Sequence, residues 1–200
     1  MTPTPLLPYR LTVCGLYELD QHAAAGVGCV VSILDPDHPD PVAFRRYPSH
    51  RRFLYRFDDV VRARDGVVAP AVANVHAILD LGREMAGDPV DHMLIHCHAG
   101  VSRSTAAAII LMVRDNPGRE AEAFAELLRI RPRSWPNALM LAIADEVLQR
   151  DGAITEHLRE HQRRIVRNHP DLAESLIGSE RAHEVLDLMQ EAEIYATAGR

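Results

Sequence analysis

Short apolar runs without polar alternation recur in the first half of this chain of 200 residues. Such runs, rich in β-branched residues, are typical of strands whose two faces are both covered, as in a parallel sheet. They predict strands at residues 10–14, 29–34, 53–57 and 93–95. Segments with the apolar spacing of helices separate and follow these strands, and this alternation predicts an α/β fold.

Helices are expected at residues 17–24, 70–87, 106–113, 121–130 and 138–148. Pro70 suits the first turn of a helix, and prolines between residues 35 and 50 recur too often for regular structure. We therefore expect a small central, mainly parallel sheet of four to five strands flanked by helices, formed by residues 8–150.

The last quarter of the chain is more polar. Residues 151–200 predict a helical C-terminal extension with a loose apolar stripe. The stripe consists of Val185, Leu186, Leu188, Met189 and Ile194. The extension could make a dimer contact or frame a substrate cleft, but covering the core is the default interpretation.

Composition narrows the class of protein. With 47% hydrophobic residues the chain can bury a sizeable core, and its net charge of −6 argues against a nucleic-acid partner. No apolar run reaches the roughly 18 residues of a membrane span, and the N-terminus has too little apolar length for a signal peptide. The three cysteines, Cys14, Cys29 and Cys97, form neither a CxxC pair nor an even framework, which favours a cytoplasmic protein without structural disulfides. The oligomeric state is not indicated.

The segment from His96 to Thr105 carries the chemistry. It lies between a predicted strand and a predicted helix, where backbone N–H groups and the helix N-terminus can converge on a tetrahedral oxyanion. Gly100 allows the loop to curl, and Arg103 offers a planar fork of donors for two phosphate oxygens. Cys97 lies at the start of this loop, where the N–H groups and the helix N-terminus give a positive electrostatic potential. This potential favours the thiolate, which is a ready nucleophile.

Neighbouring residues have supporting roles. The phosphate-binding candidates are His98, Ala99, Gly100, Val101, Ser102 and Arg103. Ser104 could hydrogen-bond the sulfur as it leaves a phosphoenzyme, and His96 could fix the loop through backbone carbonyls. His92, His96 and His98 raise the question of a metal site, but no carboxylate or second cysteine stands at ligand spacing, so we expect no metal.

The order His-Cys-x-Ala-Gly-x-Ser-Arg-Ser at residues 96–104 resembles the signature of the cysteine-dependent protein tyrosine phosphatases, above all their dual-specificity branch. The resemblance covers roughly residues 8–150. It implies a phosphatase-like fold, a phosphocysteine intermediate and no cofactor. It also implies a phosphorylated protein or a small phosphate ester as substrate, without deciding between phosphotyrosine, phosphoserine or phosphothreonine, and a small molecule.

A phosphatase of this kind needs a general acid that protonates the leaving oxygen and then activates water. In the resembling family this acid is an aspartate at the end of a strand, before the helix that precedes the signature strand. Asp59 has this position and is the first candidate, while Asp65 keeps a more usual sequence distance to the cysteine and Asp58 is a third candidate. An Arg…Pro-Asn step ending at Asn137 again resembles the family, in which the asparagine braces the catalytic loop, although a helix N-cap suits asparagine equally.

Three alternatives remain open at this point. A chain with this loop but without a working acid would be a phosphate-binding module, or pseudophosphatase. A rhodanese-like sulfur carrier has a similar cysteine loop but fits the residues after the cysteine less well. Cys14 or Cys29 could form a reversible disulfide with Cys97 that protects the nucleophile from over-oxidation.

Overall fold

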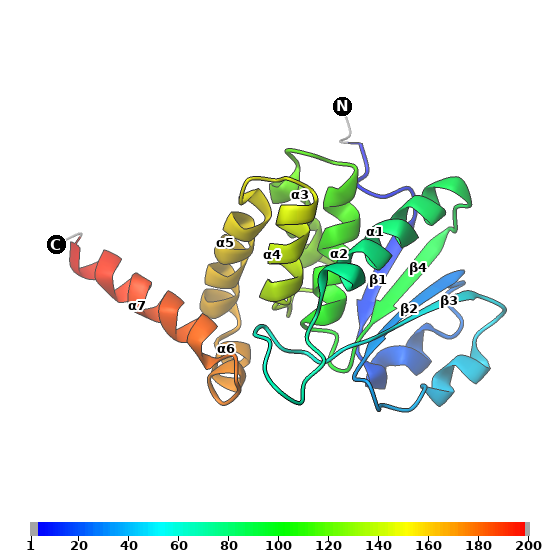
Figure 1. Cartoon of the computed structure of the whole chain (residues 1–200), viewed down its shortest axis with the longest axis horizontal. Helices are drawn as coiled ribbons and strands as arrows, with labels where there is room; N and C mark the ends of the chain where they lie inside the picture. Colours follow the sequence, from blue (N-terminus) through cyan, green and yellow to red (C-terminus); the bar gives the residue numbers. More distant parts are fainter. Residues whose placement is uncertain (1–3, 199–200) are drawn as a thin grey trace.

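Four parallel strands form the centre of the protein (Figure 1). The structure, a computed structural model, describes the backbone of residues 4–198 and the side chains of residues 4–190. The strands lie in the order β1-β4-β2-β3. Their bounds are Arg10–Cys14 for β1, Cys29–Leu34 for β2, Arg51–Arg56 for β3 and His92–His96 for β4. The predicted parallel α/β sheet is thereby confirmed.

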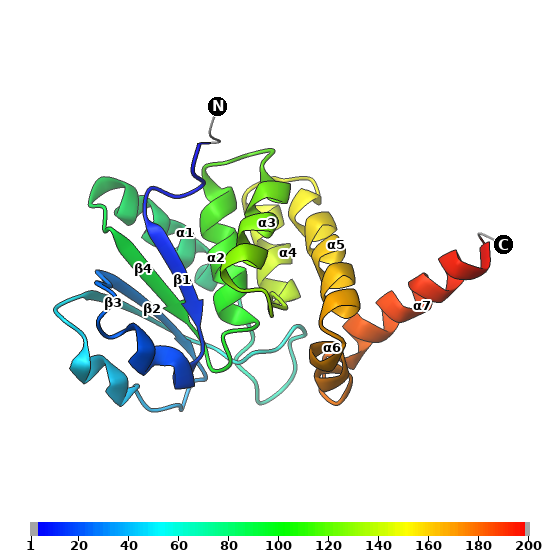
Figure 2. The ribbon, with the colours of Figure 1, turned by 180° about the vertical axis from the view of Figure 1, so that it is seen from behind.

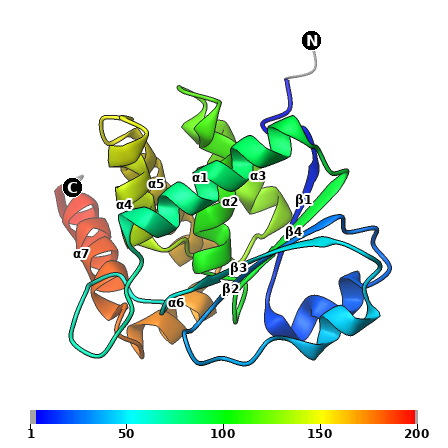
Figure 3. The same cartoon turned by 45° about the vertical axis from the view of Figure 1, so that its right-hand side comes forward.

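Helices cover both faces of the sheet, with the α-helices on one side and two 3-10 helices on the other (Figures 1 and 2). The α-helices are α1 (Val72–Gly87), α2 (Arg103–Arg114), α3 (Glu120–Ile130), α4 (Ala138–Val147), α5 (Ala153–Asn168), α6 (Pro170–Ile177) and α7 (Ala182–Ala198). The 3-10 helices are η1 (Leu16–His22) and η2 (Val42–Arg46). In Figure 3, α1 lies across α2, on which it packs.

Several predicted element bounds differ from the observed ones by one to three residues, and three of the differences bear on the start or type of an element. The segment expected as a helix at residues 17–24 is the 3-10 helix η1, and the third strand begins at Arg51 rather than residue 53. The helix expected from Pro70 begins at Val72, because Ala71 is its N-cap residue, with extended backbone. Helix ends commonly differ by one or two residues, so these shifts leave the topology unchanged.

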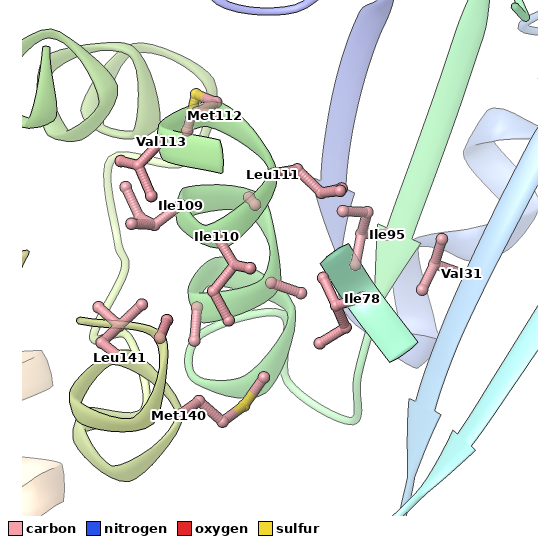
Figure 4. Packing of buried hydrophobic residues seen from close by; sticks show 14 of the residues in the cluster. Val31, Ile78, Ile95, Ile109, Ile110, Leu111, Met112, Val113, Met140 and Leu141 are labelled. Atoms are coloured by element: carbon pink, nitrogen blue, oxygen red, sulfur yellow. The ribbon is translucent and has the colours of Figure 1, made fainter. Parts of the chain in front are cut away.

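The main core lies between the sheet and the α-helices. Side chains of β2, β4, α1, α2 and α4 meet there, among them Val31, Ile95, Ile78, Ile110 and Met140 (Figure 4). Every residue of α2 from Arg103 to Val113 is buried, as expected of a helix enclosed on all sides. The first turn of α2 is therefore held firmly, and it carries the last two residues of the signature segment 96–104, which we call the signature loop.

The C-terminal extension joins the body through two clusters. Ile154 and Leu158 of α5 belong to the main core, while α6 and α7 pack around Trp135. Of the predicted apolar stripe, Val185 and Leu188 are buried, whereas Leu186 and Met189 are 50% and 43% exposed. Ile194 lies outside the residues whose side chains are described. The boundary at residue 150 stays a prediction.

Beyond these contacts, α7 runs away from the body of the protein (Figures 1 and 2). Within residues 4–198, no helix combines the length and the apolar character needed to cross a membrane.

Candidate active site

All four strands end at one edge of the sheet. Cys14 pairs with His96, and Ser32 near the end of β2 pairs with the same His96. The chain therefore leaves β1, β2, β3 and β4 side by side, and the carboxyl edge of a parallel sheet is where ligands bind in such folds. The segments that meet there begin at Gly15, Asp35, Phe57 and Cys97.

The signature loop curls against the turn after β1. Gly100 has φ +69°, and a Cβ there would lie 2.4 Å from the carbonyl carbon of Cys14. A Cβ on Gly15 would in turn lie 2.9 Å from the backbone of Ala99. The two backbones can approach so closely because both positions are glycine. The curl at Gly100 also needs the left-handed conformation, which glycine adopts without strain. The amide of Leu16 also donates to the His98 carbonyl, at 2.8 Å.

The carbonyls of the loop are all held from outside. Five successive carbonyls, those of residues 98–102, accept hydrogen bonds from groups around the loop. In a trans peptide the N–H points opposite to the carbonyl. The N–H groups of residues 99–103 therefore face away from these outer partners, toward the inside of the curl, as an anion cradle requires.

Arg131 supplies two of these outer contacts. Its guanidinium donates to the carbonyls of Gly100 at 2.9 Å and Ala99 at 3.0 Å. It also forms a two-pronged ion pair with Glu18, at 2.7 and 2.9 Å, and Glu18 accepts the Gly15 amide at 2.6 Å. Partial burial raises the pKa of Glu18, but the hydrogen bonds from Arg131 and Gly15 outweigh it and leave that pKa below its ordinary value. Glu18 is thus held as a carboxylate that fixes Arg131.

Cys97 lies at the foot of the loop and is 1% exposed. Its Sγ is 3.2 Å from the Ser104 Oγ, so the two sequence candidates are in contact. His96 beside it is buried, with Nε2 2.7 Å from the Ser32 Oγ and Nδ1 3.4 Å from the Cys97 carbonyl oxygen. Burial lowers the pKa of His96 to about 4, so its ring is neutral at pH 7 and acts through hydrogen bonds rather than charge.

Arg103 is buried at the end of the signature loop, and one nitrogen of its guanidinium already donates hydrogen bonds within the protein. Its Nη1 donates to the Asp35 carboxylate and to the Phe57 carbonyl, both at 2.6 Å. Its Nε is buried and has no hydrogen-bond partner among the described residues. A buried charged donor without an acceptor is costly, and a phosphate oxygen would satisfy it.

Asp35 also draws His98 to the rim of the site. The Asp35 amide donates to the His98 Nε2 at 3.4 Å, and the His98 ring lies against His38 at 4.5 Å between centroids. Burial lowers the pKa of His98, against the opposing effect of Asp35, and the Arg103 charge lowers it further. His98 is therefore neutral at pH 7, and Arg103 carries the positive charge of the loop.

Of the three aspartates considered as the acid, Asp59 touches the signature loop. Its Oδ1 accepts from the Ser102 hydroxyl at 2.6 Å and from the Asn137 amide at 2.9 Å. Asp58 instead closes its own loop by accepting the Val68 amide at 2.7 Å, and Asp65 is exposed in that loop. The geometry thus favours Asp59, whose role stays a prediction.

Asn137 makes the contacts expected for both roles that the sequence left open. Its Oδ1 accepts the Met140 amide at 3.0 Å, which makes it the N-cap of α4. Its Nδ2 donates to Asp59 and to the Val60 carbonyl, at 2.9 and 3.1 Å, and its backbone amide reaches the Ser102 carbonyl at 3.3 Å. One buried amide therefore connects the start of α4, the signature loop and residues 57–71, which carry Asp59 and which we call the acid loop.

The cysteine pairings left open by the sequence are not supported by the geometry. Cys29 pairs with Met93, four residues before Cys97, which at about 3.3 Å per residue is about 13 Å and far beyond disulfide reach. Cys14 is closer, but it packs with Leu94 on the 3-10 side of the sheet, whereas Cys97 belongs to the core on the α side. All three thiols are free. Burial raises the pKa of Cys14 to about 12 and that of Cys29 to about 11, so neither is a reactive thiolate.

Sequence reasoning missed Gly15, Glu18 and Asp35. Asp35 had a usable signal, because it directly follows a predicted strand whose end must lie at the carboxyl edge of the sheet. Glu18 had none, since its partner Arg131 lies 113 residues away in the chain. Within the described residues, no three or more His, Cys, Asp or Glu side chains are grouped so as to hold a metal ion.

Comparisons with known proteins show which sequences and folds this chain is similar to. No known family profile matches the chain. Over 63 residues it is 41% identical to MAP kinase phosphatase with leucine-rich repeats protein 2 of Dictyostelium discoideum, covering 32% of this chain and 8% of that protein. Protein 1 of the same name and organism is 35% identical over 92 residues, 46% of this chain and 10% of that protein. The chain thus spans a tenth or less of these relatives.

Solved structures share the fold at low sequence identity. Human DUSP28 is 18% identical, with a TM-score of 0.54, over 72% of this chain and 94% of that one. The human tyrosine phosphatase-like serine/threonine/tyrosine-interacting protein is 18% identical, with a TM-score of 0.55, over 72% and 93%. The PTP-2 phosphatase of Cydia pomonella is 24% identical, with a TM-score of 0.53, over 72% and 88%.

This is the fold of the dual-specificity phosphatases. The resemblance to the cysteine-dependent protein tyrosine phosphatase superfamily, expected from residues 96–104, is confirmed.

Proposed function

We propose that the protein is a phosphomonoester hydrolase of the protein tyrosine or dual-specificity phosphatase type, acting through a phosphocysteine on Cys97. The observation that carries the proposal is the loop around that cysteine. Its carbonyls of residues 98–102 are bonded outward, and the buried Arg103 Nε has no partner among the described residues. Donors of this kind are complementary to the oxygens of a phosphoryl group.

The first step transfers the phosphoryl group to sulfur. The Cys97 thiolate attacks phosphorus, an S–P bond forms and the ester P–O bond breaks. Asp59 in its protonated form gives its proton to the leaving oxygen. The N–H groups of residues 99–103 and the Arg103 guanidinium hold the three other oxygens, over which negative charge is spread in the transition state.

The second step returns the enzyme to its starting state. Asp59, now a carboxylate, takes a proton from water, whose oxygen attacks phosphorus as the S–P bond breaks. The Ser104 hydroxyl, 3.2 Å from Sγ, stabilises the sulfur as it leaves with the electron pair. Inorganic phosphate is released, and no step requires a metal or other cofactor.

We infer a phosphorylated protein or a small phosphate ester as the substrate, with the cytoplasm as the compartment. The names of the two curated relatives make phosphorylated MAP kinase peptides the first protein-derived substrates to test.

The deciding experiment is hydrolysis of 4-nitrophenyl phosphate with reductant and chelator present. We expect turnover by the wild type, none by Cys97→Ser, and a loss of about 10²- to 10⁴-fold in kcat for Asp59→Asn, the usual contribution of a general acid. Asp65→Asn is the matched comparison. A loss confined to Asp65→Asn would move the acid to that residue.

A second measurement separates the enzyme from a phosphate-binding module. Inorganic phosphate should raise the melting temperature of the wild type and of Cys97→Ser, but not of Arg103→Met, because binding requires the cradle and not the nucleophile. A wild type that binds phosphate in this way without any turnover would be a pseudophosphatase, and the proposed activity would be wrong.

A further inference from the structure

We propose that Arg181, in the turn between α6 and α7, is a positioning residue that aligns Asp59 for proton transfer by way of Ser102. This inference rests on the proposed phosphatase function and deepens it, because it assigns part of the acid machinery to the C-terminal extension. The resemblance to the dual-specificity phosphatases covers roughly residues 8–150 and therefore gives no reason to expect a site residue at position 181.

Arg181 is buried behind the signature loop, with 7% of its surface exposed. Its Nη1 donates to the Ser102 Oγ at 2.7 Å, and its Nη2 lies 3.3 Å from the Pro136 carbonyl oxygen. On the other side its Nε donates to Glu184 at 2.5 Å. A planar guanidinium bonded on both edges has a single orientation, so its contact with Ser102 is directional.

The direction of these bonds determines where the Ser102 proton points. A serine hydroxyl has one proton to donate and two lone pairs that accept. Because the Ser102 oxygen already accepts from Arg181, its proton is free to go to the Asp59 Oδ1, 2.6 Å away. A charged donor polarises the hydroxyl and strengthens the bond that the hydroxyl donates. Arg181 therefore holds one carboxylate oxygen of Asp59 against the loop.

Holding Oδ1 leaves Oδ2 for the leaving group. The Asn137 amide also donates to Oδ1, at 2.9 Å, so the Ser102 hydroxyl and the Asn137 amide both bind the same carboxylate oxygen. The orientation of the carboxyl group is then fixed without occupying the oxygen that carries the transferred proton. Such fixing matters because proton transfer requires the acid within hydrogen-bond reach of the leaving oxygen.

The extension is built to keep Arg181 in place. The Ser179 Oγ accepts the Arg181 amide at 3.1 Å, and the Trp135 indole donates to Glu184 at 3.2 Å. Buried Val185 and Leu188 anchor α7 around Trp135. The adjacent Glu180 also pairs with Arg64, from the loop that follows Asp59. The acid loop and the extension thus meet at this turn, where a cavity of about 300 Å³ is lined by residues 59–64, 180, 181 and 183.

The test compares two substrates that differ in their need for an acid. Phenyl phosphate has a poorer leaving group than 4-nitrophenyl phosphate. Impaired protonation of the leaving oxygen therefore slows the hydrolysis of phenyl phosphate more. We expect Arg181→Met to lower kcat at least tenfold more for phenyl phosphate than for 4-nitrophenyl phosphate, with KM for both unchanged within twofold. Arg181→Lys, which keeps a positively charged donor, should recover part of the loss. If Arg181 had a purely structural role, kcat would fall equally for both substrates, because a smaller fraction of the protein would be active.

Two further variants keep the test valid. Arg133→Met removes an arginine that pairs with Asp171 on α6 at an exposed position, and it should leave the ratio between the two substrates unchanged. Arg181→Met leaves the Glu184 carboxylate, whose side chain is 8% exposed, without a positively charged partner, so Arg181→Met/Glu184→Gln is measured beside it. The introduced glutamine keeps an oxygen for the Trp135 indole and removes the unpaired charge. The double variant should show the same selective loss on phenyl phosphate.

A double-mutant cycle with Asp59→Asn completes the experiment. If Arg181 acts through Asp59, adding Arg181→Met to Asp59→Asn changes kcat on phenyl phosphate by less than twofold. Independent losses that multiply would overturn the inference while leaving the phosphatase function intact. A wild type without Cys97-dependent turnover would overturn the proposed function, and this inference with it.

Discussion

His161 offers a measurable link between burial and acid sensitivity. It lies on α5, 2% exposed, with Nε2 3.2 Å from the Ser134 carbonyl oxygen and Nδ1 without a hydrogen-bond partner among the described residues. Burial lowers its pKa to about 4, against the smaller opposing effect of the bond to Ser134. Protonation would place a charge among packed helices, away from bulk water.

The sign of the pH effect follows from the two pKa values. Between about pH 6.5 and pH 4 the unfolded chain binds a proton at His161 and the folded chain does not. The free energy of unfolding therefore falls as the pH falls through this window. The cost approaches about 3 kcal/mol below pH 4 and is about 2 kcal/mol at pH 5. Above about pH 6.5 the penalty is absent.

The assay is urea unfolding at about pH 7.5 and about pH 5, comparing the wild type with His161→Gln. The glutamine keeps an N–H donor for Ser134 but does not titrate, so its free energy of unfolding should fall about 2 kcal/mol less between the two pH values. His96 has the same pKa of about 4 and contributes equally to both proteins, so it cancels. His76→Gln, at an exposed position, serves as the control. Identical pH dependence in the wild type and His161→Gln would refute the reasoning.

Two further predictions concern Gly100 of the signature loop and Asp35, the partner of its arginine. Gly100→Ala should lower the free energy of unfolding by more than the about 1–2 kcal/mol of a left-handed alanine and abolish phosphate binding, because its Cβ would meet backbone at 2.4 Å. Gly118→Ala, with φ +79° and no atom within 4 Å of the added Cβ, should show only the conformational cost and full activity, and equal effects of the two changes would contradict the packing argument. Asp35→Asn keeps an acceptor for the loop arginine but removes its negative charge, so the inhibition constant for inorganic phosphate should fall severalfold in a steady-state assay. An unchanged or higher constant would show that the Asp35 charge does not oppose the phosphate.

The strands and the signature loop could be predicted because their signals are local. An unalternated apolar run identifies a strand covered on both faces, and residues 96–104 carry their chemistry within nine positions. The 3-10 helix η1 could not be told from an α-helix, because both tolerate the same composition over so short a length. The partners of Arg103 and Ser102 could not be predicted either. Asp35 is 68 residues from Arg103 and Arg181 is 79 residues from Ser102, and such contacts depend on the order of strands and the path of the extension.

The burial of Trp135 has a practical consequence. It is the single tryptophan of the chain, it is 0% exposed, and it lies in the segment between Arg131 and Asn137 that holds the signature loop. Its indole donates to Glu184, and the side chains around it come largely from α5, α6 and α7. Its intrinsic fluorescence therefore reports on the seating of the last helices without any label. Detachment of α6 and α7 would bring water to the indole and shift its emission to longer wavelengths, so the state of the extension can be followed in the same cuvette as the hydrolysis reaction.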